Sequence, residues 1–344
     1  MRRFGEARWG GVAAVGGLLA LVLAWPGGPA AVLAQAPALT IYSGRTQELI
    51  GPLLQQFSQS TGIGVRVRYG ETAELAATIM EEGPNSPADV YIAQDAGALG
   101  ALAYAGRLRR LPDSLLARVE PRFRSKDGLW VGVSGRARVV AYNTRRLRPA
   151  DLPDSLAGFA DPRWRGRIGW APTNGSFQAH VTALRLLWGT ERTRRWLLAV
   201  KANAPRVYRN NTAIVAAVGA GEVDVGFVNH YYLYRFLEER GEAFPVRNYH
   251  FPGPDAGNLV NVAGAGIVDT SRQSAEAQRL VAFFLSPEAQ RYFARETFEY
   301  PLVAGVPADP RLVPLDRIRT PGVDLNHLQA LEETLRLLRE TGVL

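Results

Sequence analysis

The chain has 344 residues, of which 47% are hydrophobic and 21% charged, so it holds enough apolar material for one large domain or two lobes of ordinary size. It contains no cysteine, which excludes disulfides, thiolate metal sites, a cysteine nucleophile and lipid attachment through an N-terminal cysteine. The net charge is +8 and comes almost entirely from arginine. Such a balance suits an anionic ligand.

The N-terminal segment has the pattern of an export signal. Arg2, Arg3 and Arg8 precede an apolar run over residues 11–25, and small residues follow up to Ala34. This pattern predicts a signal peptide over residues 1–34. The run is too short to span a bilayer and no comparable run follows, so we expect an exported, periplasmic protein that does not span a membrane. The Arg2-Arg3 pair leaves both the Sec and the twin-arginine routes open.

The next segment alternates strands and helices. Residues 39–42 read as a strand, 49–57 repeat apolar residues at helical spacing, and 64–69 alternate as a half-buried strand. Residues 71–82 are predicted to be helical and 89–93 to form a strand buried on both faces. This βαβαβ order predicts a mainly parallel sheet.

A second α/β pattern follows later in the chain. We expect strands over 138–142, 167–170 and 223–228, and helices over 178–188, 213–220 and 231–240. Two α/β lobes are therefore predicted. Ligands of such sheets lie beyond the carboxyl ends of strands, which directs attention to the loops after Tyr42, Tyr69, Ala93 and Val228.

The sequence contains none of the common catalytic or nucleotide-binding motifs, and its basic clusters do not indicate a nucleic-acid partner. No strand is followed by Gly-x-Gly-x-x-Gly, and there is no Walker loop and no Gly-x-Ser-x-Gly elbow. Arginine clusters at 144–148 and 192–195 are consistent with a nucleic-acid patch or a solvated surface, and export favours the surface. We therefore expect neither an enzyme nor a nucleic-acid partner, and a secreted enzyme remains the least favoured alternative.

Two adjacent tyrosines, Tyr231 and Tyr232, stand where the strand over 223–228 runs into a helix. At such a junction both rings can face one cleft, where two phenolates would favour a small, highly charged cation over a soft metal. Only a strong Lewis acid would deprotonate both, because a free phenol has a pKa near 10. The local sequence alone favours the simpler interpretation that these residues belong to the apolar face of an amphipathic helix. The neighbouring His230 is interpreted as a flanking residue.

Small polar residues mark a possible anion site. Residues 172–176 precede a helix and would expose free N–H groups at its positive end, although an ordinary N-cap explains them as well. Asn211 at a helix start and Asn229 at a strand end also fit caps.

Taken together these segments resemble the bacterial periplasmic ferric-ion-binding proteins. The resemblance covers nearly all of the chain after the signal and is carried by residues 41–45, 86–90, 136–143, 164–168, 229–232 and 299–306. It implies the type II periplasmic-binding-protein fold, with two lobes, a two-strand hinge and a cleft that closes on ferric iron. The lobes would be residues 35–137 plus 262–310 and residues 138–261 plus 311–344. Such a protein acts as a monomer and delivers iron to an inner-membrane ABC permease and its ATPase.

The resemblance also implies roles for individual residues. Tyr231 and Tyr232 match the tyrosine ligand pair. Arg45 matches an arginine that helps to hold a carbonate in some members. Positions that hold a synergistic anion in other members are matched by Asn174, Gly175, Ser176, Asn211 and Asn229.

Three positions depart from the family pattern. A histidine ligand is replaced by Thr46, a glutamate ligand by Gln94, and a further tyrosine falls near Phe177. Two phenolates leave open positions on Fe³⁺, which bicarbonate or carbonate, phosphate, or a third tyrosine, Tyr69, would fill. The alternative function within this fold is an importer receptor for a small organic anion or a polyamine.

Overall fold

The computed structural model describes residues 38–344, and the expected signal peptide over residues 1–34 lies outside this part of the chain. The strands are β1 Ala38–Ser43, β2 Gly64–Tyr69, β3 Val90–Ala93, β4 Leu108–Arg109, β5 Val131–Asn143, β6 Ile168–Trp170, β7 Arg206–Val207, β8 Val225–Asn229, β9 Val246–Tyr249 and β10 Val260–Val268. The α-helices are α1 Gln47–Thr61, α2 Thr72–Glu82, α3 Ala96–Tyr104, α4 Asp113–Leu116, α5 Gly175–Trp188, α6 Thr190–Ala202, α7 Asn211–Ala220, α8 Tyr231–Arg240, α9 Ser274–Phe284, α10 Pro287–Arg295 and α11 Leu331–Glu340. Short 3-10 helices are η1 Gly83–Asn85, η2 Pro121–Phe123, η3 Pro149–Asp151, η4 Leu156–Ala160, η5 Pro162–Trp164, η6 Ala256–Asn258 and η7 Leu325–Gln329.

The strands join in the order β2-β1-β3-β10-β5-β8-β6-β7, with β4 beside β10 and β9 beside β5. The pairs β2-β1 and β1-β3 are parallel, as the βαβαβ order predicts. The pairs β6-β8 and β6-β7 repeat this arrangement in the second half. Two mainly parallel units are therefore linked through antiparallel strands.

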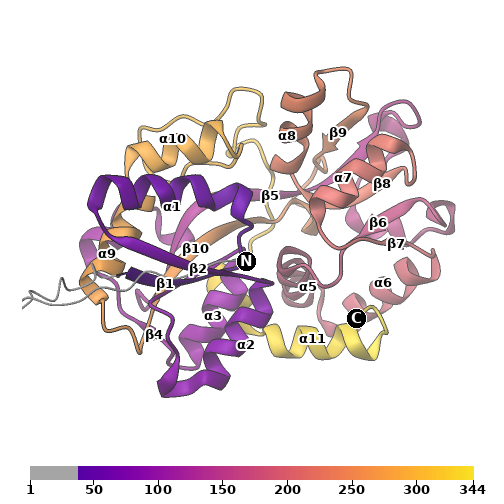
Figure 1. Cartoon of the computed structure of the whole chain (residues 1–344). Helices are drawn as coiled ribbons and strands as arrows, with labels where there is room; N and C mark the ends of the chain where they lie inside the picture. Colours follow the sequence, from indigo (N-terminus) through magenta and orange to yellow (C-terminus); the bar gives the residue numbers. More distant parts are fainter. Residues whose placement is uncertain (1–37) are drawn as a thin grey trace, which may run out of the picture. The chain divides into compact units, whose positions relative to one another are not determined.

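Strand β5 is the structural link between the two units (Figure 1). Its first part pairs with β10 up to Ala137, and its second part pairs with β8 from Arg138 onward. All 13 of its residues are buried. The sequence pattern predicted only residues 138–142, because Ser134 and Arg136 interrupt the apolar run in the first part of the strand.

Three apolar cores accompany this arrangement. One lies around β1, β3 and β10, and includes Ile41, Ile92 and Ala265. Another lies around β6 and α5, and includes Phe159 and Trp164. The remaining core surrounds α8, as detailed below with the site.

The C-terminal segment packs against both units. Leu325 and Leu328 pack in the core of the first unit, whereas Leu337 and Leu338 pack in the core of the second. Residues 311–344, which the sequence places in the second lobe, therefore contribute leucines to the cores of both units.

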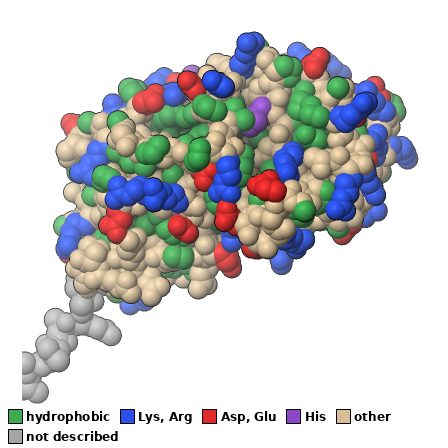
Figure 2. Space-filling view, turned by 90° about the horizontal axis from the view of Figure 1, so that it is seen from above, with side chains coloured by type: hydrophobic (Ala, Val, Ile, Leu, Met, Phe, Trp, Pro, Cys, Tyr) green, Lys and Arg blue, Asp and Glu red, His purple; other side chains and the backbone are tan. Residues whose placement is uncertain are grey.

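The surface in Figure 2 mixes charges of both signs. Lys and Arg side chains are scattered over this face and interspersed with Asp and Glu. Arg311, for example, pairs with both Glu238 and Asp309. This face offers no continuous basic track of the kind that follows a phosphate backbone. Within residues 38–344, no helix combines the length and apolarity needed to cross a membrane.

Candidate functional site

The tyrosine pair begins helix α8 directly after β8. Tyr231 is the first residue of the helix, and both side chains are buried, with 0% of Tyr231 and 4% of Tyr232 exposed. Their ring centroids lie 4.3 Å apart at an interplanar angle of 29°, so the two rings are stacked. The hydroxyl of Tyr231 is buried without a hydrogen-bond partner. A buried hydroxyl of this kind is costly unless something binds it.

His230 holds the start of α8 in place. Its Nδ1 accepts a hydrogen bond from the backbone N–H of Ala137 at 3.1 Å, and its Nε2 donates to the carbonyl of Phe298 at 2.8 Å. Burial lowers the pKa of His230 to about 3, so the ring is neutral. Both ring nitrogens are occupied by the backbone, and His230 therefore positions the pair without adding a free ligand atom.

Two kinds of neighbour shift the pKa of Tyr232 in opposite directions. Burial raises the pKa of Tyr232 well above its ordinary value, and the neighbouring Tyr231 raises it further. The cationic groups of Arg45 and Arg136 act in the opposite direction. Burial therefore keeps Tyr232 protonated in the empty protein, and a cation that binds must displace the proton.

A cavity of about 740 Å³, lined by residues of both units, reaches Tyr232. Tyr232 and Asn174 line it from the second unit, and Arg45, Thr46 and Gln94 line it from the first. The amide oxygen of Gln94 is buried without a partner. Thr46 and Gln94, which replace the histidine and glutamate ligands of the family pattern, therefore both line this cavity. Their hydroxyl and amide groups bind Fe³⁺ less well than imidazole and carboxylate do.

Tyr69 lies at the rim of the same cavity. It is 37% exposed, and it lines the cavity together with Glu48 and Glu71. Burial raises its pKa first, and the charge of Glu48 raises it further. Tyr69 therefore sits in a more open and more acidic setting than the stacked pair.

The five small polar residues predicted for an anion come together through hydrogen bonds and adjacent backbone. Asn174 caps α5, and its side-chain oxygen accepts from the amide of Asn211 at 3.0 Å and from the hydroxyl of Ser176. The backbone N–H of Asn229 donates to the Asn211 side chain at 3.2 Å. Gly175 is the first residue of α5, and a side chain there would meet Asp95 and Thr72. Asn174 therefore caps helix α5 and also belongs to the cluster of polar residues predicted to bind an anion.

Arg45 is engaged in a buried ion pair. Its two terminal nitrogens donate to the carboxylate of Glu299 at 2.9 and 2.6 Å, and the side chains are 1% and 0% exposed. Ser134 and Thr297 donate to the same carboxylate. The guanidinium lies 5.6 Å from the ring of Tyr231. A forked contact of Arg45 with an oxoanion would therefore require breaking this salt bridge.

Two arginines that the sequence reasoning left without a role lie in the same region. Arg136 and Arg138 project from one face of β5, since alternate residues of a strand share a face, and both are buried. Arg138 donates to the side chain of Asn229 at 3.1 Å. The sequence signal for these buried arginines is their spacing, two residues apart in a strand that is otherwise rich in apolar residues.

The third departure, Phe177, is a core residue. Its ring packs edge-on against Trp170 at 5.7 Å, within the core of the second unit. In residues 38–344 no three or more His, Cys, Asp and Glu side chains gather as a metal site would require. A metal bound here would therefore depend on the phenols.

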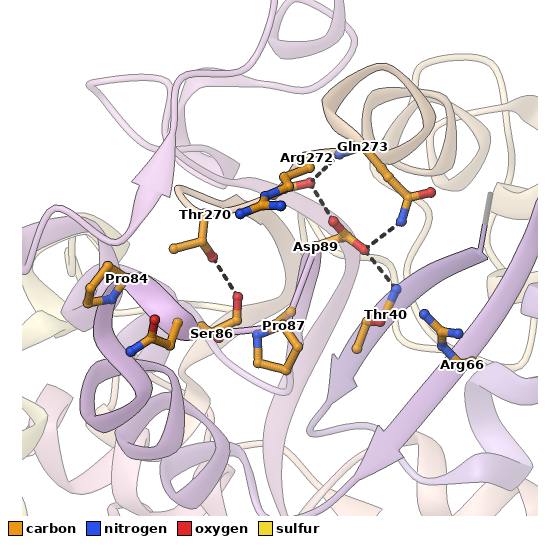
Figure 3. A pocket seen from close by; sticks show the side chains of 12 residues that line it. Thr40, Arg66, Pro84, Ser86, Pro87, Asp89, Thr270, Arg272 and Gln273 are labelled. Atoms are coloured by element: carbon orange, nitrogen blue, oxygen red, sulfur yellow. Dashed lines mark hydrogen bonds between the residues drawn. The ribbon is translucent and has the colours of Figure 1, made fainter.

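A separate pocket of about 480 Å³ lies at the amino ends of the first-unit strands (Figure 3). Its central carboxylate, Asp89, accepts from the backbone N–H of Thr40, from Ser271 and from Gln273. It shares no lining residue with the cavity at the tyrosines. Asp89 is fully engaged in holding strands together, so this pocket is a structural feature.

Two α/β units that share strand β5, with a cavity lined by residues of both, are the arrangement of a solute-binding protein. Residues 85–325 match the family described as bacterial extracellular solute-binding protein, and the chain belongs to this family.

Proteins similar to this chain include iron-binding proteins, a narrower class than solute-binding proteins in general. The chain is 36% identical over 326 residues to the major ferric iron-binding protein of Neisseria meningitidis serogroup B, covering 91% of this chain and 96% of that protein. The structure of iron-bound HitA from Pseudomonas aeruginosa matches at 39% identity and a TM-score of 0.85, over 89% of this chain and 99% of that chain. A Trichodesmium protein in complex with iron and citrate matches at 30% identity and a TM-score of 0.74, with the same coverage. The type II fold, the resemblance to periplasmic ferric-ion-binding proteins and the expectation of a binding protein rather than an enzyme are confirmed.

Proposed function

We propose that this chain is the periplasmic binding protein of an ABC-type iron importer, and that Fe³⁺ is held by the phenolates of Tyr231 and Tyr232. The observation that carries the proposal is the buried, stacked pair with an unpartnered hydroxyl at its inner member. The ferric iron in the names of the relatives points to the same cargo.

The chemistry of the donors suits a hard trivalent ion. Phenolate oxygens are hard and anionic, and Fe³⁺ is acidic enough to displace phenol protons at neutral pH. Because burial raises the pKa of Tyr232, a weaker Lewis acid would leave it protonated. The same burial that protects an empty site from common divalent ions thus favours ferric iron.

The remaining coordination positions are assigned to a synergistic anion, bicarbonate or carbonate first and phosphate second. Its proposed contacts are the cluster of Asn174, Ser176, Asn211 and Asn229 and the backbone at Gly175, the first residue of α5. Gly175 admits the anion because it carries no side chain. Tyr69 is the residue to consider if no anion is needed.

The lobes follow from the strand arrangement. The proposed lobes are residues 35–137 plus 262–310 and residues 138–261 plus 311–344. The hinge consists of β5 and β10. The protein acts as a monomer after export, and its partners are an inner-membrane permease and its ATPase, as the solute-receptor family implies.

The test is a titration of iron-free protein with a ferric chelate, followed through the visible absorption that arises when phenolate donates charge to iron. We expect colour to rise to one iron per protein and to fall when a strong chelator is added. Protein that stays colourless and leaves equimolar ferric iron unbound would contradict the proposal.

A second candidate is a receptor for a small organic anion. The buried arginines Arg136 and Arg138 favour it, and the same residues disfavour a polyamine because they carry like charge. If this function is correct, the iron-free protein binds the organic anion with full affinity and iron has no effect on that affinity.

A further inference from the structure

The segment that follows α10 contains an unusual backbone conformation at Phe298. This residue has a φ of +55°, in the left-handed region, and is only 4% exposed. Of the non-glycine residues in the described range 38–344, it shares a positive φ only with Ala204. A left-handed conformation strains a bulky residue, because its Cβ approaches the following carbonyl oxygen. Such a conformation persists only where the surrounding contacts hold it in place.

The carbonyl group of Phe298 holds the residue that precedes the tyrosine pair. It accepts a hydrogen bond from Nε2 of His230 at 2.8 Å. The ring of Phe298 packs against that of Tyr234, further along α8, with the ring centroids 5.7 Å apart. Tyr300 stacks on the imidazole of His230, with the centroids 4.7 Å apart and an interplanar angle of 29°. Residues 298–300 therefore hold the first turn of α8 through both backbone and side chains.

The next residue of the segment, Glu299, faces a different part of the protein. Its carboxylate accepts from both terminal nitrogens of Arg45, which lies between β1 and α1, and from the hydroxyl of Ser134 in β5 at 3.0 Å. The N–H of Tyr300 donates to the carbonyl of Gly135 at 2.8 Å, and the N–H of Gly135 donates back at 2.7 Å. Successive residues of this short segment thus contact α8, β5 and the loop before α1.

The left-handed conformation explains how neighbouring residues reach such different partners. The φ angle at Phe298 sets the direction in which its carbonyl group and the following residues continue. At an ordinary negative φ, the carbonyl of Phe298 and the carboxylate of Glu299 could not both keep their partners while Tyr300 stays paired with Gly135. Packing of an aromatic ring alone does not require this backbone, because phenylalanine packs equally well from helices and strands. The contacts at both sides therefore account for the strain.

We propose that Phe298 is a positioning residue for the iron site. Its left-handed backbone binds His230 on one side and directs Glu299 to Arg45 on the other, and so fixes the start of α8 against residues of the proposed first lobe. Phe298 is not itself an iron ligand and acts on the tyrosine pair through His230. The inference rests on the proposed function for the role of the tyrosines, whereas the hydrogen bond from His230 exists without iron.

The experiment separates the backbone of Phe298 from its side chain with two substitutions. Phe298→Ile keeps a buried apolar side chain, but its β-branched residue disfavours a positive φ. Phe298→Gly adopts a positive φ without strain but removes the ring. The matched control is Phe284→Ile, the same change at a fully buried position in the regular helix α9.

Iron affinity and stability should follow opposite orders in the two variants. In competition with a chelator, Phe298→Ile should bind ferric iron at least about tenfold more weakly than the native protein, and Phe298→Gly within about threefold of it. The Tm of Phe298→Gly should nevertheless be the lower of the two, because it loses more apolar contacts. Phe284→Ile should keep native iron affinity. Native affinity in Phe298→Ile overturns the proposal, as does a tenfold loss in folded Phe298→Gly, which decides the matter even if Phe298→Ile fails to fold.

A measurement without iron tests the contact itself. The chain has four histidines, so ¹⁵N-histidine NMR of the iron-free protein can resolve the Nε2–H of His230, with His230→Gln as the assignment variant. Its proton resonance should persist in Phe298→Gly and in Tyr231→Phe, and should shift or exchange away in Phe298→Ile. An unchanged resonance in Phe298→Ile contradicts this inference. Native protein that shows this resonance but binds no ferric iron contradicts the proposed function instead, so the two failures are distinguishable.

Discussion

At the scale of single residues, the iron assignment depends on two hydroxyl groups. Replacing Tyr231 or Tyr232 by phenylalanine keeps the stacked ring and deletes one candidate ligand. Tyr234 provides a matched control, because it lies on the same helix and its hydroxyl donates instead to the carbonyl of Arg311.

We expect Tyr231→Phe and Tyr232→Phe each to weaken ferric binding at least about a hundredfold, roughly 2.7 kcal/mol, with little change in Tm. Tyr234→Phe should keep native affinity and colour. The measurement is competition for iron against a chelator of known affinity, read by absorbance. Native affinity in both cleft variants would show that the metal is held elsewhere.

The buried pair of Arg45 and Glu299 is a second test at this scale. Glu299→Gln should lower the free energy of unfolding by about 3–5 kcal/mol, because it leaves a buried guanidinium without its counter-charge. Replacing both partners, as in Arg45→Met with Glu299→Gln, should recover part of that loss. Chemical denaturation measures both, and a loss below about 1 kcal/mol in the single variant would indicate that water reaches the pair.

At the scale of elements, periodicity predicted strands β1, β2, β3, β6 and β8 and helices α1, α2, α5, α7 and α8, whereas α3, α6, β9, β10 and the helices after β10 were not predicted. The strand over 64–69 and the helix over 231–240 match the observed bounds. The first part of β5 was missed, because buried arginines look like surface residues until their environment is known. The pairing of Arg45 with Glu299 joins positions 254 residues apart, and no local pattern carries that information. In the same way, the sequence marked the tyrosines but gave no indication that His230 is committed to the backbone.

Strand β8 approaches helix α7 so closely that only glycine fits at Gly226. A Cβ there would lie 2.1 Å from the side chain of Ile214. Gly226→Ala should therefore destabilise the protein by about 1–3 kcal/mol through overpacking, and should also disturb the start of α8. The double variant Gly226→Ala with Ile214→Ala has room for the new Cβ and should recover iron affinity. It should recover less of the stability, because the smaller alanine removes apolar contacts from the core.

The control for that prediction is Gly253→Ala, because a Cβ at Gly253 meets nothing within 4 Å. Its unfolding free energy should remain within about 0.5 kcal/mol of the native value. Thermal melts and iron competition on the three variants check the series. Equal behaviour of Gly226→Ala and Gly253→Ala would mean that β8 and α7 can move apart freely.

At the scale of the whole molecule, buried neutral histidines make stability depend on pH. Burial lowers the pKa of His180 to about 3, the charge of Arg138 contributes, and the Nε2 of His180 donates to the carbonyl of Ala256. Burial also lowers the pKa of His250 to about 4. In the unfolded chain these groups titrate near 6.5. The unfolded state therefore takes up protons first as pH falls, and stability is lost progressively below about pH 6.5.

We expect His180 alone to contribute a loss of about 2 kcal/mol between pH 8 and pH 5. His180→Gln should be less stable at pH 8 but should flatten the decline over this range. Although burial opposes it, ion pairs with Arg146 and Arg167 lower the pKa of Asp224, so its contribution disappears only at still lower pH. Urea denaturation at several pH values checks the slope, and an unchanged slope in His180→Gln would mean that this ring is protonated in the folded protein.

The division of the site between separate elements has a consequence for how such receptors diversify. The phenols are fixed at the start of α8 by the backbone bonds of His230, whereas the arginines belong to β5 and the amides to the first turns of α5 and α7. If the proposed site is correct, substitutions in β5 or at the helix starts would change which anion is accepted without moving the tyrosines of α8. Selectivity for the anion and selectivity for the metal would then be able to change independently among related proteins.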